Sequence, residues 1–126
     1  MTTYYYKNAS GNWSDANAWN TAANGSGTDA SHPLAADSVC DLNGKSITLD
    51  VSPTVAIVQA LTGLLTVNGS RSINANVAYS GTSTSGMVIL PTGTALAING
   101  QLTNSGSGFA VVLSPGNGSL VVSNPG

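Results

Sequence analysis

Few side chains in this chain could perform acid–base, nucleophilic or metal chemistry. The 126 residues include one histidine, His32, one cysteine and five carboxylates, all of them aspartate. A zinc site needs three or four ligands, and the sequence holds no second histidine and no pair of cysteines to build one. A Ser–His–Asp triad would depend on His32, but no nucleophile elbow surrounds any serine. We therefore expect no enzyme activity from these residues.

The aspartates admit two other readings. Asp37, Asp41 and Asp50 could meet as an acid–base pair or as ligands of a calcium ion. Their spacing is not that of a calcium-binding loop, so we interpret them as strand-end and turn residues. No glycine-rich loop follows a strand and opens a helix, which argues against a nucleotide site. We expect neither a metal ion nor a cofactor.

Cys40 is the single cysteine, so the chain cannot form an internal disulfide. It stands between Val39 and Asp41, and we expect a small buried hydrophobic side chain there. The alternatives are a bridge to another chain or a reactive thiol.

Five aromatic residues near the N-terminus form the candidate interaction surface. Trp13 and Trp19 could make a flat platform for a sugar, but we favour a role in covering the open end of a hydrophobic core. In a strand, Tyr4 and Tyr6 point to one face and Tyr5 to the other. That pattern is typical of a strand between its own core and a neighbouring subunit.

Charge is scarce and unevenly placed. Charged residues make up 6% of the chain, against about a quarter of an ordinary soluble domain. After Asp50 the only charged side chain is Arg71, and the formal net charge is −2. These values argue against binding to nucleic acid or to an anionic membrane. The apolar stretch at 55–67 is too short and too interrupted to span a bilayer.

The elements that would carry these residues follow a repeated phrase. Residues 56–69, 87–100 and 110–124 each read as strand, turn, strand, with spacings of 31 and then about 23 residues. The alignment makes four sets of positions equivalent: Ile57/Val88/Val111, Val58/Ile89/Val112, Leu65/Leu96/Leu120 and Val67/Ile98/Val122.

Such a repeat predicts an all-β chain wound as a short parallel β-helix, or solenoid, with an aromatic-rich N-terminal cap and arm. Aliphatic residues would stack inward on like residues, and Gly or Asn would supply positive φ at the corners. The alternative is an antiparallel β-sandwich or jelly roll, since Asn-Gly also marks hairpins. We expect one domain over 1–126, with an arm and cap at 1–45 and coils at 46–126.

The stretch over residues 4–51 resembles the opening of β-helical surface proteins of bacteria and bacteriophages. The matching pattern is G-x-W, a second Trp, a Gly-rich loop, P-x-x-x-D-x-V and an aliphatic strand, here Gly11, Trp13, Trp19, Pro33, Asp37, Val39, Ile47 and Leu49. The resemblance implies a β-helix behind a cap, and it implies no catalytic residues.

Because the N-terminus has no apolar stretch of a secretory signal, the resemblance points to a phage virion component made in the host cytoplasm. We expect a capsid decoration (cement) protein on the outer capsid surface. It would bind the major capsid protein or another virion protein as a homotrimer. The alternative is a receptor- or glycan-binding β-helical module of a tail fibre or surface adhesin.

Overall fold

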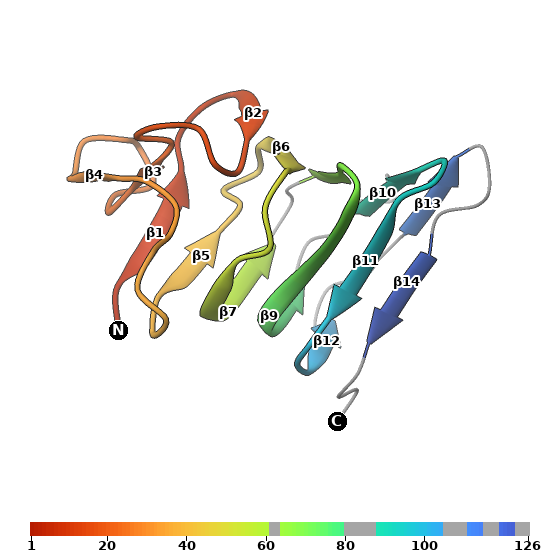
Figure 1. The fold of residues 1–126 in the computed structure, drawn as a ribbon. Helices are drawn as coiled ribbons and strands as arrows, with labels where there is room; N and C mark the ends of the chain where they lie inside the picture. Colours follow the sequence, from red (N-terminus) through yellow and green to blue (C-terminus); the bar gives the residue numbers. More distant parts are fainter. Residues whose placement is uncertain (61–63, 80–87, 105–110, 115–118, 123–126) are drawn as a thin grey trace.

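The computed structural model is all-β and describes residues 1–60, 64–79, 88–104, 111–114 and 119–122 (Figure 1). No helix occurs in these ranges. The strands are β1 (Thr3–Tyr6), β2 (Ser10–Asn12), β3 (Trp19–Asn20), β4 (Asp29–Ala30), β5 (Val39–Asp41), β6 (Ser46–Leu49), β7 (Thr54–Ala60), β8 (Leu64–Val67), β9 (Ser70–Tyr79), β10 (Val88–Pro91), β11 (Ala95–Ile98), β12 (Leu102–Asn104), β13 (Val111–Ser114) and β14 (Ser119–Val122).

The strands form two sheets, and from β5 to β11 successive strands alternate between them. The nine-stranded sheet has the order β14-β11-β9-β7-β5-β1-β3-β4, with β12 also paired to β9. The five-stranded sheet has the order β13-β10-β8-β6-β2. In Figure 1 the strands of the larger sheet lie side by side, from β1 at the N-terminal end to β14 at the other. Between β5 and β11, two strands that pair in one sheet are therefore separated in the sequence by one strand of the other sheet.

Pairing between the described strands is parallel except around β3. β3 runs antiparallel to β1 and to β4. Every other described pair is parallel, including β5 with β7 and β8 with β10. An antiparallel sandwich or jelly roll needs antiparallel neighbours throughout, so that alternative is wrong for this part of the chain.

The core is built from alternate residues that stack on like residues of the next strand. In the five-stranded sheet Ile47 pairs with Leu65, and Leu65 with Val88. In the larger sheet Val58 pairs with Cys40 on one side and Val77 on the other. Each of these six side chains is at most 2% exposed, as expected when side chains of alternate residues face the interior. The hydrophobic core therefore lies between the two sheets.

Two of the three repeated phrases align as expected. Val88 pairs with Val111, and Leu96 pairs with Leu120, both in parallel register. The second and third phrases therefore occupy equivalent places, one level apart in the two sheets.

The first phrase does not align as expected. Leu65 pairs with Val88 rather than with Leu96, and Ile57 lies in the nine-stranded sheet, whereas Val88 lies in the five-stranded one. The cause is β9, whose first residues pair with β11 and whose last residues pair with β12. Because this one long strand pairs with two later strands, the first repeated phrase begins in the nine-stranded sheet and the second begins in the five-stranded sheet.

The described residues hold no helix that is long and apolar enough to cross a membrane.

Candidate functional site

Three aromatic side chains form a cluster that closes the N-terminal end of the core. The rings of Tyr6 and Trp19 meet edge to face with centroids 5.1 Å apart. Trp13 packs against Trp19 with a centroid distance of 4.7 Å. The Trp19 indole N–H donates to the carbonyl oxygen of Trp13 at 3.1 Å, and the Tyr6 hydroxyl donates to that of Asn12 at 2.8 Å. In the aromatic cluster the rings pack on one another, and the Tyr6 hydroxyl and Trp19 indole N–H are hydrogen-bonded, as buried Tyr and Trp require.

The structure therefore divides the five predicted interaction residues. Tyr6, Trp13 and Trp19 are 0% exposed. A partner cannot contact them, and a sugar platform of Trp13 and Trp19 is wrong because both indoles lie inside the core. Tyr4 packs against the core from the same face as Tyr6. Tyr5, the next residue along the strand, is also partly exposed, so contact of Tyr4 and Tyr5 with a partner stays a prediction.

Hydrogen bonds around Asp29 and Asn20 hold the two ends of the loop over 21–28 together. Both carboxylate oxygens of Asp29 accept hydrogen bonds from Lys7 Nζ at 2.8 Å, and Oδ1 also accepts from Asn20 Nδ2 at 2.7 Å. These hydrogen bonds lower the pKa of Asp29, that from Lys7 most. Asn20 Oδ1 in turn accepts from the backbone of Ala22 and Gly27 at 2.9 Å. Asp29 and its partners thus have a structural role.

The other aspartates lie apart, each with its own local partners. Asp41 is buried and accepts from the backbone N–H of Asn43 and from Gln59. Asp50 accepts from the backbone N–H and the hydroxyl of Ser14. Asp37 pairs with the N-terminal amine at 3.5 Å. Their positions agree with strand-end and turn roles, and the described residues contain no group of three or more His, Cys, Asp or Glu that could hold a metal ion.

Cys40 is a buried member of the core. Its side chain is 0% exposed and it pairs with Tyr4 on β1 and with Val58 on β7. Burial raises the pKa of its thiol to about 12, so the thiol stays protonated and unreactive near neutral pH. The prediction of a small buried hydrophobic side chain is confirmed.

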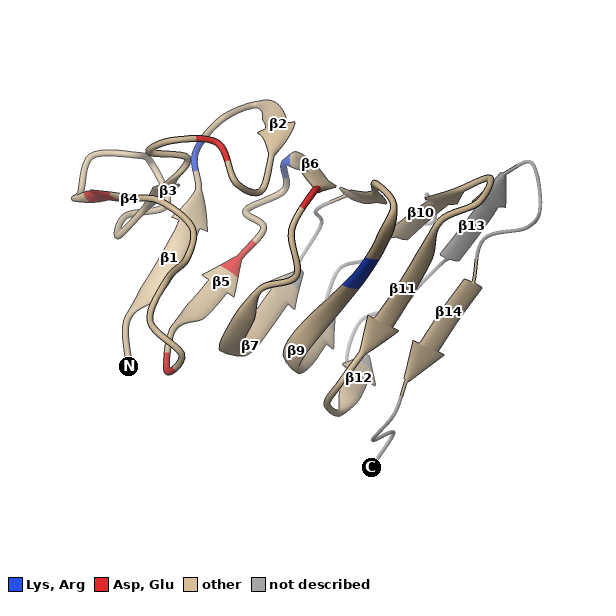
Figure 2. Ribbon diagram, in the orientation of Figure 1, with Lys and Arg blue, Asp and Glu red and all other residues tan. Residues whose placement is uncertain are grey.

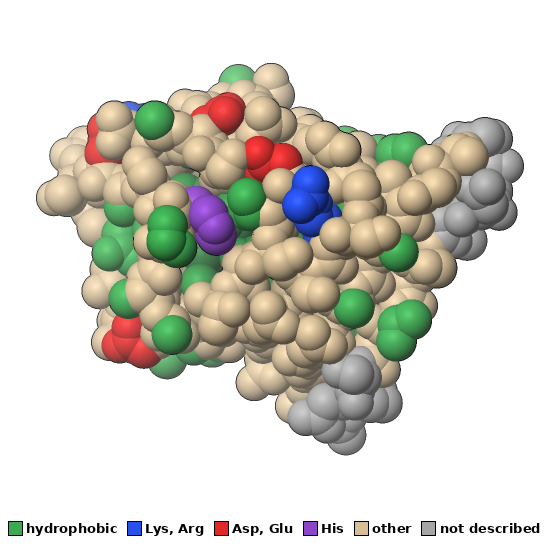
Figure 3. Space-filling model, viewed as in Figure 1, with side chains coloured by type: hydrophobic (Ala, Val, Ile, Leu, Met, Phe, Trp, Pro, Cys, Tyr) green, Lys and Arg blue, Asp and Glu red, His purple; other side chains and the backbone are tan. Residues whose placement is uncertain are grey.

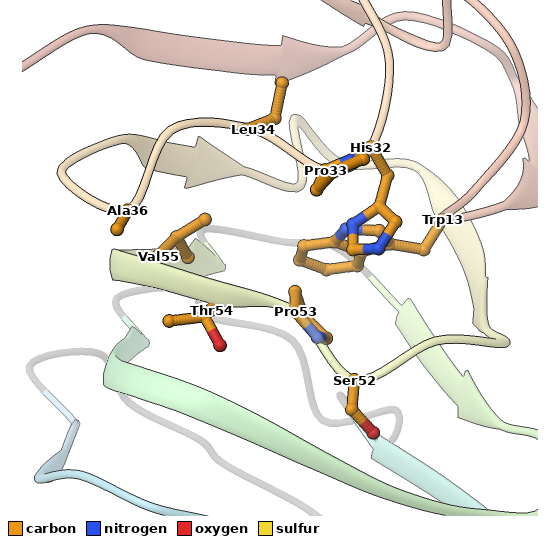
Figure 4. A pocket seen from close by; sticks show the side chains of 9 residues that line it. All are labelled: Trp13, His32, Pro33, Leu34, Ala36, Ser52, Pro53, Thr54 and Val55. Carbon is orange, nitrogen blue, oxygen red and sulfur yellow. The ribbon is translucent and has the colours of Figure 1, made fainter.

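A pocket of about 310 Å³ opens beside the aromatic cluster. It lies between the loop that precedes β5 and the segment that enters β7, and nine residues line it (Figure 4): Trp13, His32, Pro33, Leu34, Ala36, Ser52, Pro53, Thr54 and Val55. Figure 3 shows hydrophobic side chains gathered around the histidine on this face. Trp13 has no exposed surface, so it is the covered floor of this His32 pocket.

Two hydroxyl groups of the His32 pocket accept hydrogen bonds from β9. The Ser52 hydroxyl accepts from the backbone N–H of Ser72 at 3.0 Å, and Thr54 Oγ1 accepts from Asn74 Nδ2 at 3.3 Å. The His32 imidazole makes no hydrogen bond to the residues that the structure describes. Sequence reasoning missed this pocket, because its two segments lie about 20 residues apart in the sequence and carry no motif.

Surface charge and open strand edges distinguish the two ends of the molecule. Figure 2 places the charged residues on the N-terminal part, the last of them being Arg71 on β9. In the described part of the chain, β14 pairs with β11 alone and β13 with β10 alone. On β14, Val121 is 57% exposed. Among the residues that the structure describes, β13 and β14 are therefore uncharged strands that each have a paired strand on one edge alone.

Comparisons with known protein families, with curated protein sequences and with solved structures found no match to this chain.

Proposed function

We propose that the chain is a short parallel β-solenoid with a non-enzymatic, structural function, a decoration protein of a bacteriophage capsid. Stacked aliphatic pairs in parallel register and the alternation of β5 to β11 between two sheets support the solenoid. The buried aromatic cluster would be its N-terminal cap. The resemblance of residues 4–51 to phage and bacterial surface proteins supports the virion assignment.

The observation that carries the proposal is the uncharged C-terminal end with its open strands. Parallel β edges normally carry lysine, proline or a covering segment that prevents pairing with other chains. β14 has the sequence Ser119-Leu120-Val121-Val122 and no such charge. A strand of this kind suits permanent contact with another protein, which here would be the capsid protein or a second copy of this chain.

Binding would stabilise the capsid by mass action. A protein that binds only the assembled shell contributes RT ln(1 + [L]/Kd) per site, about 2.7 kcal/mol at a concentration 100 times Kd. Uncharged contacts make this binding insensitive to salt, because no ion pairs are available for screening. The chain itself would need no catalytic group.

The test is co-sedimentation with purified shells of the phage that encodes the chain, and the melting temperature of those shells with and without it. We expect saturable binding and a higher melting temperature. Val121→Lys should weaken binding at least about tenfold, because the lysine charge must be desolvated at the contact. Ser70→Lys adds the same charge on β9, away from the open edge, and should change binding less than about twofold. Absence of binding by the wild-type chain contradicts the proposal.

A glycan-binding module is the competing function. Of its predicted surface, Trp13 and Trp19 are buried and the loop at 20–33 remains, so we favour the capsid proposal. Saturable binding of oligosaccharides together with indifference to shells would reverse this order.

A further inference from the structure

Lys7, Asn20 and Asp29 lie on one face at the N-terminal end of the larger sheet. Asn20 is paired with Tyr5 on β1 and with Asp29 on β4. Lys7 follows Tyr5 by two residues, and its backbone N–H donates to the Ala18 carbonyl oxygen at 2.9 Å, which continues the pairing of β1 with β3. Because side chains alternate along a strand, Lys7 points to the same face as Tyr5. An amine, a carboxamide and a carboxylate therefore meet there.

Asp29 connects the other two groups. Lys7 Nζ donates to both of its carboxylate oxygens at 2.8 Å, and Asn20 Nδ2 donates to Oδ1 at 2.7 Å. The amine and amide nitrogens thus lie within hydrogen-bond distance of one and the same oxygen atom. The hydrogen bond from Lys7 lowers the pKa of Asp29, so this group is a carboxylate that can accept a proton. In the described part of the chain, Asp29 is the one charged side chain that pairs with Lys7.

The carboxamide oxygen of Asn20 is held by two backbone donors. Oδ1 accepts from the N–H groups of Ala22 and Gly27, each at 2.9 Å, and Asn20 is 0% exposed. Glycine is needed at position 27, because a Cβ there would lie 2.9 Å from Asn20 Oδ1 and 2.2 Å from Thr21 Oγ1. Two N–H groups aimed at a carbonyl oxygen in a site closed to solvent stabilise negative charge that develops on that oxygen. The arrangement therefore favours attack by a nucleophile at the carboxamide carbon.

We propose that Lys7 and Asn20 become joined by an isopeptide bond, which the folded chain forms itself with Asp29 as the proton carrier. The Lys7 ammonium group first loses a proton to solvent. The neutral Nζ attacks Cγ of Asn20, and the negative charge on Oδ1 is stabilised by the N–H groups of Ala22 and Gly27. Asp29 takes a proton from the attacking nitrogen and gives it to Nδ2, the bond between Cγ and Nδ2 breaks, and ammonia leaves. The products are one amide and one ammonia, so no oxidant, reductant or co-reactant is required.

The bond would close the segment that carries most of the aromatic cluster. Trp13 and Trp19 lie between Lys7 and Asn20 in the sequence. A covalent link between two points of a chain restricts its unfolded state, so the linked chain should unfold at a higher temperature than the open chain. The site lies at the opposite end of the larger sheet from β14, so this proposal can fail while the capsid proposal stands.

The test is the intact mass of the full chain after prolonged incubation at pH 7 and at pH 9. We expect a loss of about 17 Da, the mass of one ammonia molecule, and a faster loss at pH 9, where more of the amine is neutral. Trypsin cleaves after lysine and should no longer cut after Lys7, and tandem mass spectrometry should find Lys7 linked to Asn20. A chain kept unfolded in urea should not form the link, because its amine is not held beside the carboxamide.

Two lysine variants provide a matched pair. Lys7→Arg keeps the positive charge beside Asp29 but offers no nucleophilic amine, so the link should be absent. Lys45→Arg makes the same exchange before β6, outside the site, and should become linked as the wild type does. Asp29→Asn removes the proton carrier and should slow the reaction at least about tenfold. Tryptophan fluorescence shows whether each variant is folded.

Four outcomes would overturn the proposal. The first is an unchanged mass after incubation at pH 9, and the second is a mass loss that persists in Lys7→Arg. The third is the same mass loss with normal cleavage after Lys7, which would identify a succinimide at one of the Asn-Gly pairs of the sequence. The fourth is a link from Lys7 to Asp29 instead of Asn20.

Discussion

Trp19 is the central ring of the aromatic cluster that covers one end of the core. It contacts Tyr6 and Trp13 at once, and its indole N–H donates to the Trp13 carbonyl. We therefore expect Trp19→Phe to lower the free energy of unfolding by about 2–3 kcal/mol, from the lost ring volume and the unpaired carbonyl. Urea unfolding measures the loss. Tyr5→Phe, at a partly exposed site outside the cluster, should stay within about 0.5 kcal/mol, and an equal loss in both variants would contradict the role of the cluster.

Cys40 makes stability fall in alkaline solution. Burial raises the pKa of its thiol from 9.0 to about 12. Above the lower value the unfolded chain loses the thiol proton while the folded chain keeps it, so the unfolded state binds fewer protons. The free energy of unfolding should then drop by about 1.4 kcal/mol per pH unit between these two pKa values.

The comparison with Cys40→Ala isolates this contribution of the thiol. Other groups, including Tyr6, whose pKa burial also raises, titrate in the same range in both proteins. Urea unfolding at pH 8 and pH 10 should show a larger loss for the wild type than for the variant. Equal losses would mean that the thiol ionises in the folded chain.

At the scale of elements, Gly69 and Gly100 are each required for a different structural reason. Gly69 adopts a φ of +81°, as expected at a corner that demands the left-handed region. The equivalent residue of the second phrase, Gly100, does not, so positive φ was the wrong reason there. A Cβ at Gly100 would lie 2.1 Å from the Ala75 carbonyl oxygen on β9. Gly100 is thus required for close approach of the backbone to β9.

We therefore expect Gly100→Ala to cost about 2–3 kcal/mol or more of unfolding free energy, since the β9 backbone must move. Gly93→Ala is the matched control, because its φ of +78° is strained for alanine but nothing lies within 4 Å of the added Cβ. That variant should lose about 1 kcal/mol. Thermal unfolding of the two proteins gives the comparison, and a smaller effect at Gly100 than at Gly93 would be inconsistent with the close approach.

The repeated phrases show what a strand pattern can and cannot predict. Alternating aliphatics predict inward stacking, and Leu96 on Leu120 confirms it. The same alternation fits either sheet, because both sheets bury one face against the same core. The residues around Leu65 carry no signal that β9 will pair with both β11 and β12. The strands and their direction of stacking were therefore predictable, and the place of the first phrase was not.

The candidate site was less predictable than the fold. Trp13 and Trp19 are large aromatic residues in a polar stretch, and their composition predicts equally an exposed platform and a buried cap. Only their contacts with each other and with Tyr6 separate the two. The His32 pocket depends on packing of the loop at 32–36 against the segment at 52–55, and tertiary packing of two such segments leaves no periodic signal in the sequence.

For the whole molecule, stability should decline from the capped end to the open end. β7 has partners on both sides, β5 and β9, whereas β14 has β11 alone. In structures where each level contacts only its neighbours, the terminal level opens first. Hydrogen exchange should be slowest in β5 and β7 and fastest in β13 and β14. Uniform exchange across all strands would indicate a single cooperative unit instead.

If copies of the chain associate through the C-terminal strands, β14 should become more stable and its hydrogen exchange should slow. The N-terminal end is closed by the aromatic cluster, so head-to-tail growth into filaments is blocked, and a closed oligomer such as the predicted homotrimer must use the uncharged C-terminal half. Light scattering should then show a mass that rises with concentration, and the exchange rate in β14 should fall over the same range. Val121→Lys should remain monomeric with fast exchange in β14, while Ser70→Lys should associate as the wild type does, because its charge lies off the open edge. A wild-type chain that stays monomeric at millimolar concentration would contradict the homotrimer. Under the capsid proposal alone, exchange in β14 should slow only when shells are added.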